Sequence, residues 1–176
     1  MNYNYTKTAL YAYPNIEAVM DQIDDFVERK ALSSMSDFSP CLEQCEKILD
    51  YTAQKDALIN LKLMIKSVLL KLSPLELDLL DYKYFKQKDK EYYVDFDSSS
   101  RKYFRRQVSL VKKMAFLFDK EGLTDEWFNE NCLTSNFFRE LLKRVQIQEL
   151  QSKKNKSKKV KITCEKAPIE RLKLSA

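Results

Sequence analysis

The amino-acid sequence predicts an all-α protein, a helical bundle, and three observations lead to this fold class. The 176 residues include a single glycine, Gly122, whereas β-hairpins and sharp strand–helix turns need several. Apolar residues make up 44% of the chain and charged residues 32%, so a core can be buried beneath an ordinary polar surface. Along most of the chain the apolar residues recur at steps of three and four, the period of an amphipathic helix.

The first predicted unit is an N-terminal helical hairpin over residues 14–72. Pro14 opens a helix that reaches about Leu32, because proline is favoured at the first helical position. Pro40 opens a second, longer helix, in which a break near Thr52 is left open. The predicted apolar face of this second helix consists of Cys41, Cys45, Ile48, Leu49, Leu58, Leu61, Ile65, Val68 and Leu72.

The second predicted unit, residues 73–122, begins with a strong helix-start signal. Ser73 is the expected N-cap, Pro74 the first helical residue, and Glu76 stands three residues after the cap, which makes a capping box. In this helix Leu75, Leu79, Leu80, Tyr82 and Phe85 are available to the core. A short helix, EYYVDF, is expected next, and Ser98 or Ser99 can cap the helix that follows it.

A long helix from Ser99 to about Phe118 completes this unit, with Gly122 as its C-cap. Its spacing predicts one buried stripe, made of Phe104, Val108, Val111, Ala115 and Phe118. The opposite side is basic, with six lysines and arginines and no acidic residue between Ser99 and Lys113.

The rest of the chain divides into a helical pair and a tail. Residues 123–150 are expected to form two helices, the first capped by Thr124 and the second starting at Thr134 or Ser135. Residues 151–176 are expected to form a basic disordered tail, because they hold nine basic residues and little to bury. Residues 1–13 show no clear period.

The charge is unevenly distributed along the chain. The total is +5, but residues 1–81 carry −5 and residues 114–150 carry −3, while residues 82–113 carry +6 and residues 151–176 carry +7. Such asymmetry favours a polyanionic partner, and nucleic acid before a membrane surface. A solvated basic face with a solubilising tail is the alternative interpretation.

The order of elements between residues 72 and 114 is that of a helix-turn-helix: a capped helix, a short helix, a tight turn and a basic helix. Arginine forks bidentately to guanine or phosphate, and serine donates to phosphate oxygens, so a basic helix led by serines suits the major groove. The predicted DNA-contacting residues are Ser98, Ser99, Ser100, Arg101, Lys102, Arg105, Arg106, Ser109, Lys112 and Lys113.

This segment resembles region four of bacterial sigma factors and the sigma-like regulators of phages. The residues that match the opening of that region are Leu72, Ser73, Glu76, Leu79, Leu80, Tyr84 and Phe85. The residues that match its next stretch are Glu91, Tyr92, Phe96, Ser99, Tyr103, Arg105 and Arg106. Two positions depart from the pattern, since Tyr93 replaces an alanine and Asp97 replaces the turn glycine. The resemblance implies a contact with RNA polymerase, although residues 1–71 show no match to sigma region two.

Catalytic and metal-binding roles are not expected. The chain has no histidine, which removes Ser-His-Asp and Cys-His catalysis, and one glycine, which removes glycine-rich phosphate loops. Cys41 and Cys45 fall on one helix face without the spacing of a zinc site. Asp24, Asp25 and Glu28 lie on the outer face of the first long helix, where no cleft would shift a pKa. We therefore expect no enzyme, no cofactor and no metal.

Two functions remain for a chain with these features. The first is a sequence-specific DNA-binding transcription regulator that acts on double-stranded DNA. The alternative is a non-catalytic helical adaptor, in which residues 14–72 dimerise or dock a protein partner. The lack of a signal-peptide pattern and of an apolar run near ~20 residues predicts a cytoplasmic protein without a membrane partner, and a homodimer is left open.

Overall fold

Every regular element of the structure, a computed structural model, is a helix in the residues that it describes, 1–33, 41–85 and 100–165. Residues 153–165 are described by their backbone alone. The elements are α1 (Tyr3–Ala12), the 3₁₀ turn η1 (Tyr13–Asn15), α2 (Ile16–Ser33), α3 (Cys41–Leu69), α4 (Pro74–Leu80), the π turn η2 (Asp81–Phe85), α5 (Ser100–Lys120), α6 (Asp125–Asn131) and α7 (Asn136–Glu165). The all-α class is confirmed.

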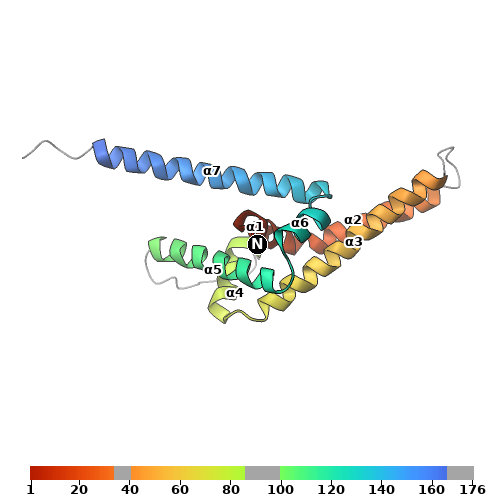
Figure 1. Cartoon of the computed structure of the whole chain (residues 1–176), viewed down its shortest axis with the longest axis horizontal. Helices are drawn as coiled ribbons and strands as arrows, with labels where there is room; N and C mark the ends of the chain where they lie inside the picture. The colour runs from red at the N-terminus through yellow and green to blue at the C-terminus, as the bar shows by residue number, and fades with distance from the viewer. Residues whose placement is uncertain (34–40, 86–99, 166–176) are drawn as a thin grey trace, which may run out of the picture.

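Helices α2 and α3 form the expected hairpin, which extends away from the other helices (Figure 1). The rings of Phe26 and Tyr51 lie 4.2 Å apart between the two helices. Lys55 donates to Asp24 at 2.6 Å and so adds an ion pair across the hairpin. Helix α3 runs unbroken through Thr52, whose hydroxyl bonds back to the carbonyl oxygen of Ile48 at 2.9 Å.

Only the second half of the predicted apolar face of α3 is buried. The buried residues of that half are Leu58, Leu61, Ile65 and Val68. Cys41, Cys45 and Leu49 were expected on the same face but are exposed, because the first half of α3 contacts α2 alone and extends beyond the core. Cys132, in contrast, is buried, and burial raises the pKa of its thiol to about 12.

Helix α1 lies at the centre of the fold, although residues 1–13 show no helical period in the sequence. It packs against both α5 and α7 (Figure 1). Ala9, Leu10 and Ala12 are fully buried in a core that also includes residues of α2 to α7. Residues of the three predicted folded units, 14–72, 73–122 and 123–150, thus share one core with α1.

The burial of α1 includes two threonines. Thr6 and Thr8 are fully buried, and their hydroxyls donate to the carbonyl oxygens of Asn2 and Asn4 at 3.1 and 2.8 Å. A buried hydroxyl that bonds within its own helix leaves no unsatisfied donor, so these residues fill the core without a large desolvation penalty.

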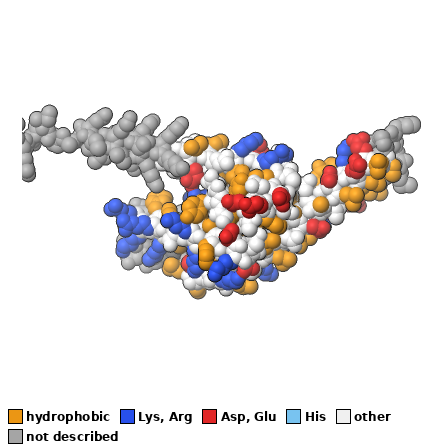
Figure 2. Space-filling model, viewed as in Figure 1, with side chains coloured by type: hydrophobic (Ala, Val, Ile, Leu, Met, Phe, Trp, Pro, Cys, Tyr) orange, Lys and Arg blue, Asp and Glu red, His pale blue; other side chains and the backbone are white. Residues whose placement is uncertain are grey.

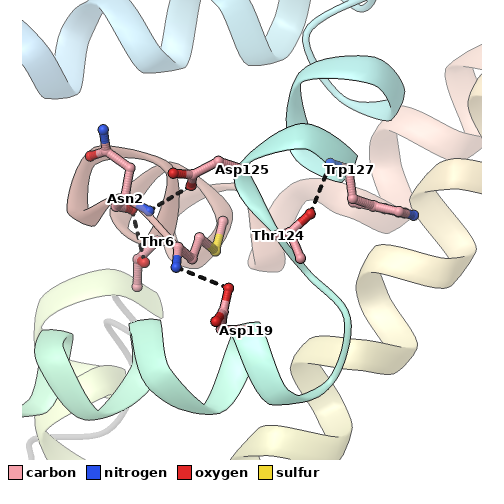
Figure 3. A network of polar contacts seen from close by, with 7 residues as sticks. Asn2, Thr6, Asp119, Thr124, Asp125 and Trp127 are labelled. Carbon is pink, nitrogen blue, oxygen red and sulfur yellow. Dashed lines mark hydrogen bonds and ion pairs between the residues drawn. The ribbon is translucent and has the colours of Figure 1, made fainter.

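Polar contacts join the start of the chain to α5 and α6 (Figure 3). The backbone N–H of Asn2 donates to Asp125 at 2.6 Å, and the amino group of Met1 lies 3.2 Å from Asp119. Thr124 caps α6, as the sequence predicts, by accepting from the N–H of Trp127 at 3.2 Å. These contacts place α1 against the junction of α5 and α6.

The helix-start signal at Ser73 is confirmed. Glu76 accepts from the backbone N–H of Ser73 at 2.9 Å and from its hydroxyl at 3.0 Å. Leu79 and Leu80 are buried as expected, whereas Leu75 and Tyr82 are exposed. The chain turns into the π turn η2 after Leu80, and this shift brings Tyr84 into the core in place of Tyr82.

The end of α5 also follows the sequence prediction. Gly122 has a φ of +87°, the left-handed conformation that a helix C-cap requires. The N–H of Leu123 then bonds to the carbonyl oxygen of Phe118 at 2.9 Å, which closes the last turn.

Helix α7 continues to Glu165, past the point where the sequence predicts disorder. The lysine-rich stretch contains no glycine or proline before Pro168, and lysine itself is a good helix former. Residues 166–176 of the predicted tail lie outside the described residues.

The contact between α1 and α6 can be tested with Asp125→Ala. This variant should have a free energy of unfolding lower by about 1–2 kcal/mol. It loses the acceptor for the N–H of Asn2, and it loses a favourable charge in the first turn of α6. Urea unfolding followed by circular dichroism measures this. Glu126→Ala is the matched control, since Glu126 lies in the same turn but is exposed. Equal losses in both variants would mean that only the helix charge matters.

Candidate nucleic-acid interface

The basic helix of the sequence is α5, and among its described side chains the buried ones all lie in its second half. The buried residues of this half are Leu110, Val111, Met114, Ala115 and Phe118. They pack against α1 and α3. The first half projects past the core, so its amino end lies at the surface (Figure 1).

The predicted buried stripe of α5 is therefore wrong in its first two positions. Phe104 and Val108 are 60% and 57% exposed. The helix is longer than the core that it covers, and the apolar period continues beyond the end of that core. Leu110 and Met114, which the prediction left out, are buried instead.

The predicted DNA-contacting residues within the described part of α5 are all exposed where their side chains are described. These residues are Arg101, Lys102, Arg105, Arg106, Ser109, Lys112 and Lys113. At about 100° per residue they lie opposite the buried side of the helix. Figure 2 shows lysine and arginine side chains gathered over this end of the molecule. Ser98 and Ser99 lie outside the described residues, and Ser100 is the first residue of α5.

Three arginines of this basic surface have no carboxylate partner among the described residues, whereas Lys113 has one. Lys113 forms an ion pair with Glu76 of α4 at 2.7 Å. Arg101, Arg105 and Arg106 have no ion pair within the described part of the chain. An arginine without an ion pair keeps its fork of donors for a phosphate or a base edge.

Aromatic contacts support the projecting half of α5. The ring of Tyr103 meets that of Tyr82 edge to face, with centroids 6.1 Å apart, and Gln107 donates to the Tyr103 hydroxyl. Tyr103 is half-buried. The basic half of α5 is thus attached to η2 and is not an isolated helix end.

A groove of about 380 Å³ lies beside the basic surface, between α5 and α7. Phe104 and Val108 line one wall, Val145 and Gln148 of α7 line the other, and α1 contributes residues that include Tyr11. An ion pair between Lys7 and Glu149 joins α1 to α7 at this groove. This groove could not be predicted from the sequence, because residues 1–13 show no helical period and yet α1 contributes to its lining.

The predicted helix-turn-helix falls only in part within the described residues. The first helix is present as α4 and the third as α5, and the Glu76–Lys113 ion pair joins them. The expected middle helix, EYYVDF, and the departures at Tyr93 and Asp97 lie outside the described residues. The turn geometry of the resemblance therefore stays a prediction.

The acidic residues Asp24 and Asp25, expected on the outer face of the first long helix, are exposed on α2. Asp24 is paired with Lys55. Within the described residues, no group of three or more potential metal ligands lies close together. In the same residues, no helix combines the length and the apolar composition needed to cross a bilayer.

Comparison with models of protein families, with curated proteins and with solved structures finds no match to this chain.

The Glu76 carboxyl connects the start of α4 to the basic helix and has a perturbed pKa. Partial burial raises this pKa, but hydrogen bonds from Lys113 and Ser73 lower it by more, so the net shift is downward. A carboxyl whose pKa is lowered by folding stabilises the fold at pH values above its ordinary pKa. This contribution to the free energy of unfolding is lost as the pH falls through the lowered pKa.

Glu76→Gln should therefore reduce stability in a pH-dependent way. We expect a loss of about 1 kcal/mol at neutral pH, from a partly exposed ion pair and a cap, and a smaller loss as the pH falls through the lowered pKa of Glu76. Urea unfolding at a series of pH values measures both. Asp78→Asn removes a charge from the same helix, outside the capping contact, and serves as control. A difference between Glu76→Gln and the native protein that stayed constant with pH would contradict the assignment.

Proposed function

We propose that this chain is a non-catalytic, sequence-specific DNA-binding transcription regulator, with the first half of α5 as its recognition helix. One observation carries the proposal: the amino-terminal half of a 21-residue helix projects from the core with a basic face, on which Arg101, Arg105 and Arg106 have no ion pair among the described residues. Its start has the positive end of the helix dipole, which also favours contact with phosphate.

The dimensions of the projecting segment suit a duplex. The ten residues from Ser100 to Ser109 span about 15 Å, and a helix with its side chains is about 10–12 Å across. The major groove of B-DNA is about 12 Å wide, so a single helix enters it. Arg101 and Arg105 are one turn apart on the exposed side and are the side chains that we assign to base edges or phosphates.

The lysine-rich end of α7 adds a second basic element to this proposal. In Figure 1 the carboxyl end of α7 and the amino end of α5 extend toward the same side of the molecule. Residues 153–161 include six lysines and no acidic residue. We assign these lysines to the phosphate backbone, where they raise affinity without reading sequence.

The resemblance to sigma region four implies the remaining partners. A regulator of this kind acts in the cytoplasm on double-stranded DNA and touches RNA polymerase. The adaptor alternative draws support from the leucines exposed along α3, which suit a protein contact. The two roles use different helices.

The double variant Arg101→Ala/Arg105→Ala tests the recognition helix. We expect at least a tenfold loss of duplex affinity, because a good base contact contributes about 1–3 kcal/mol. Fluorescence anisotropy on duplexes selected from a random pool measures this, and thermal unfolding should be unchanged because both side chains are exposed. Arg139→Ala/Arg144→Ala removes two exposed arginines from α7 and should bind as the native protein does. Equal losses in the two variants would reduce the effect to total charge.

Removal of residues 153–176 tests the second basic element. The shortened chain should keep its sequence preference, while the slope of log K against log salt becomes less steep by close to one for each phosphate that the tail had neutralised. Titrations at several salt concentrations give that slope. A lost preference with an unchanged slope would assign base reading to the tail and would contradict the proposal.

A further inference from the structure

Helix α3 has a second apolar face that nothing in the described structure covers. Four leucines, Leu42, Leu49, Leu63 and Leu70, are 73%, 67%, 59% and 82% exposed. They fall at intervals of seven or fourteen residues, and Leu70 extends the helix by one bond to Lys66. Residues seven apart lie on the same side of a helix, displaced by about 20°.

This row of leucines lies on the side of α3 that faces away from the core. The buried residues, among them Leu58, Leu61 and Ile65, occupy the other side of the helix. Three residues after each position of the leucine row in α3 lies a second exposed row, made of Cys45, Thr52, Ile59 and Lys66, in which Ile59 is 38% exposed. The two rows have heptad spacing, and the second row is apolar at Cys45 and Ile59.

We propose that this leucine face is a dimerisation surface, on which α3 of a second copy of this chain packs antiparallel. The dimer is independent of DNA binding, because none of the basic residues of α5 belongs to the face. Such a row extends for roughly 42 Å along the helix, and monomeric proteins rarely leave so long an apolar stripe exposed.

The charges of α3 support a second copy and set its direction. Among the exposed charged residues of α3 without an ion pair in the described part of the chain, Glu46 and Asp50 lie in the first half, Asp56 lies near the middle and Lys66 lies in the second half. Antiparallel packing brings Lys66 of each copy near Glu46 of the other. Glu46 and Lys66 have no ion pair within the described residues and are exposed, so they remain available for this contact.

Parallel packing is disfavoured by two charged residues of the exposed face, Asp56 and Lys66. In a parallel pair Asp56 would meet the partner's Asp56 in the seam, and Lys66 would meet the partner's Lys66. In the antiparallel register Leu42, Leu49, Asp56 and Leu63 each face a position of the second row. Leu49 then faces the partner's Ile59, Leu63 faces the partner's Cys45, Asp56 faces the hydroxyl of the partner's Thr52, and Leu42 lies against the stem of the partner's Lys66.

The resulting assembly is a four-helix arrangement in which two α2–α3 hairpins pack through α3. Each hairpin extends away from its own core, so the other copy can reach the leucine face along its length (Figure 1). The two-fold axis makes the interface self-complementary, since the same residues serve both copies. Asp56 is the one charged residue within the leucine row, and it limits the affinity.

Sedimentation of the full chain over a range of concentrations tests the proposal with three proteins. The native chain should show a monomer–dimer equilibrium. Leu49→Glu/Leu63→Glu should be monomeric, with the native thermal unfolding curve at concentrations where the native chain is also monomeric. Ile147→Glu/Leu150→Glu introduces the same charges at exposed apolar positions of α7 and should dimerise as the native chain does. A native chain that stays monomeric throughout, or a control that dissociates while the α3 variant does not, would overturn the proposal.

Two further variants test the seam and its direction. Asp56→Leu completes the leucine row and should tighten the dimer about tenfold. Leu63→Cys in that background should form a disulfide with the partner's Cys45 under mild oxidation, which peptide mapping identifies. A disulfide between two Cys45 residues in place of this one would show parallel packing and would refute the proposed orientation.

Discussion

The arrangement of the other helices depends on the burial of α1. This short helix lies between α5 and α7 and contacts both, so it sets how far apart they are. Its aromatic residues add contacts to two further elements: Tyr5 stacks on Phe128 of α6 at 5.0 Å, and Tyr11 meets Tyr84 of η2 at 4.7 Å. The buried residues of α5 that share this core lie in its second half, and the first half projects beyond the core. The candidate interface therefore depends on where the core that contains α1 ends.

Local signals in the sequence predict most of the helices. Ser73 with Glu76, Gly122, and Thr124 each mark a helix end by a contact between residues close in the chain, and the structure contains all three ends. The amphipathic period locates α2 and the second half of α3 for the same reason, since the period depends on the chain alone. The exposure of the arginines of α5 was also predictable, because a face without an apolar residue has no place in a core.

The rest depends on contacts between distant residues. Helix α1 buries Thr6 and Thr8, which do not count as apolar, so its buried side gives no period. Phe104 and Leu49 continue apolar periods that are genuine, yet they lie beyond the ends of the core. A period shows which residues share a side of a helix, but it does not show where the neighbouring helix ends. Exposed apolar residues at such positions therefore mark where the core ends, and one of the two, Leu49, belongs to the leucine face that we assign to assembly.

The two ends of the molecule differ in net charge. Residues 1–81, which include the α2–α3 hairpin, carry −5, whereas residues 100–113 hold six basic residues and no acidic one. The structure places the hairpin and the amino end of α5 on opposite sides of the core (Figure 1). A polyanion is repelled from the first and attracted to the second, so in the proposed complex long-range electrostatics would orient a duplex before contact forms. The same repulsion would keep nucleic acid away from the leucine face of α3, so the two proposed surfaces are compatible with one another.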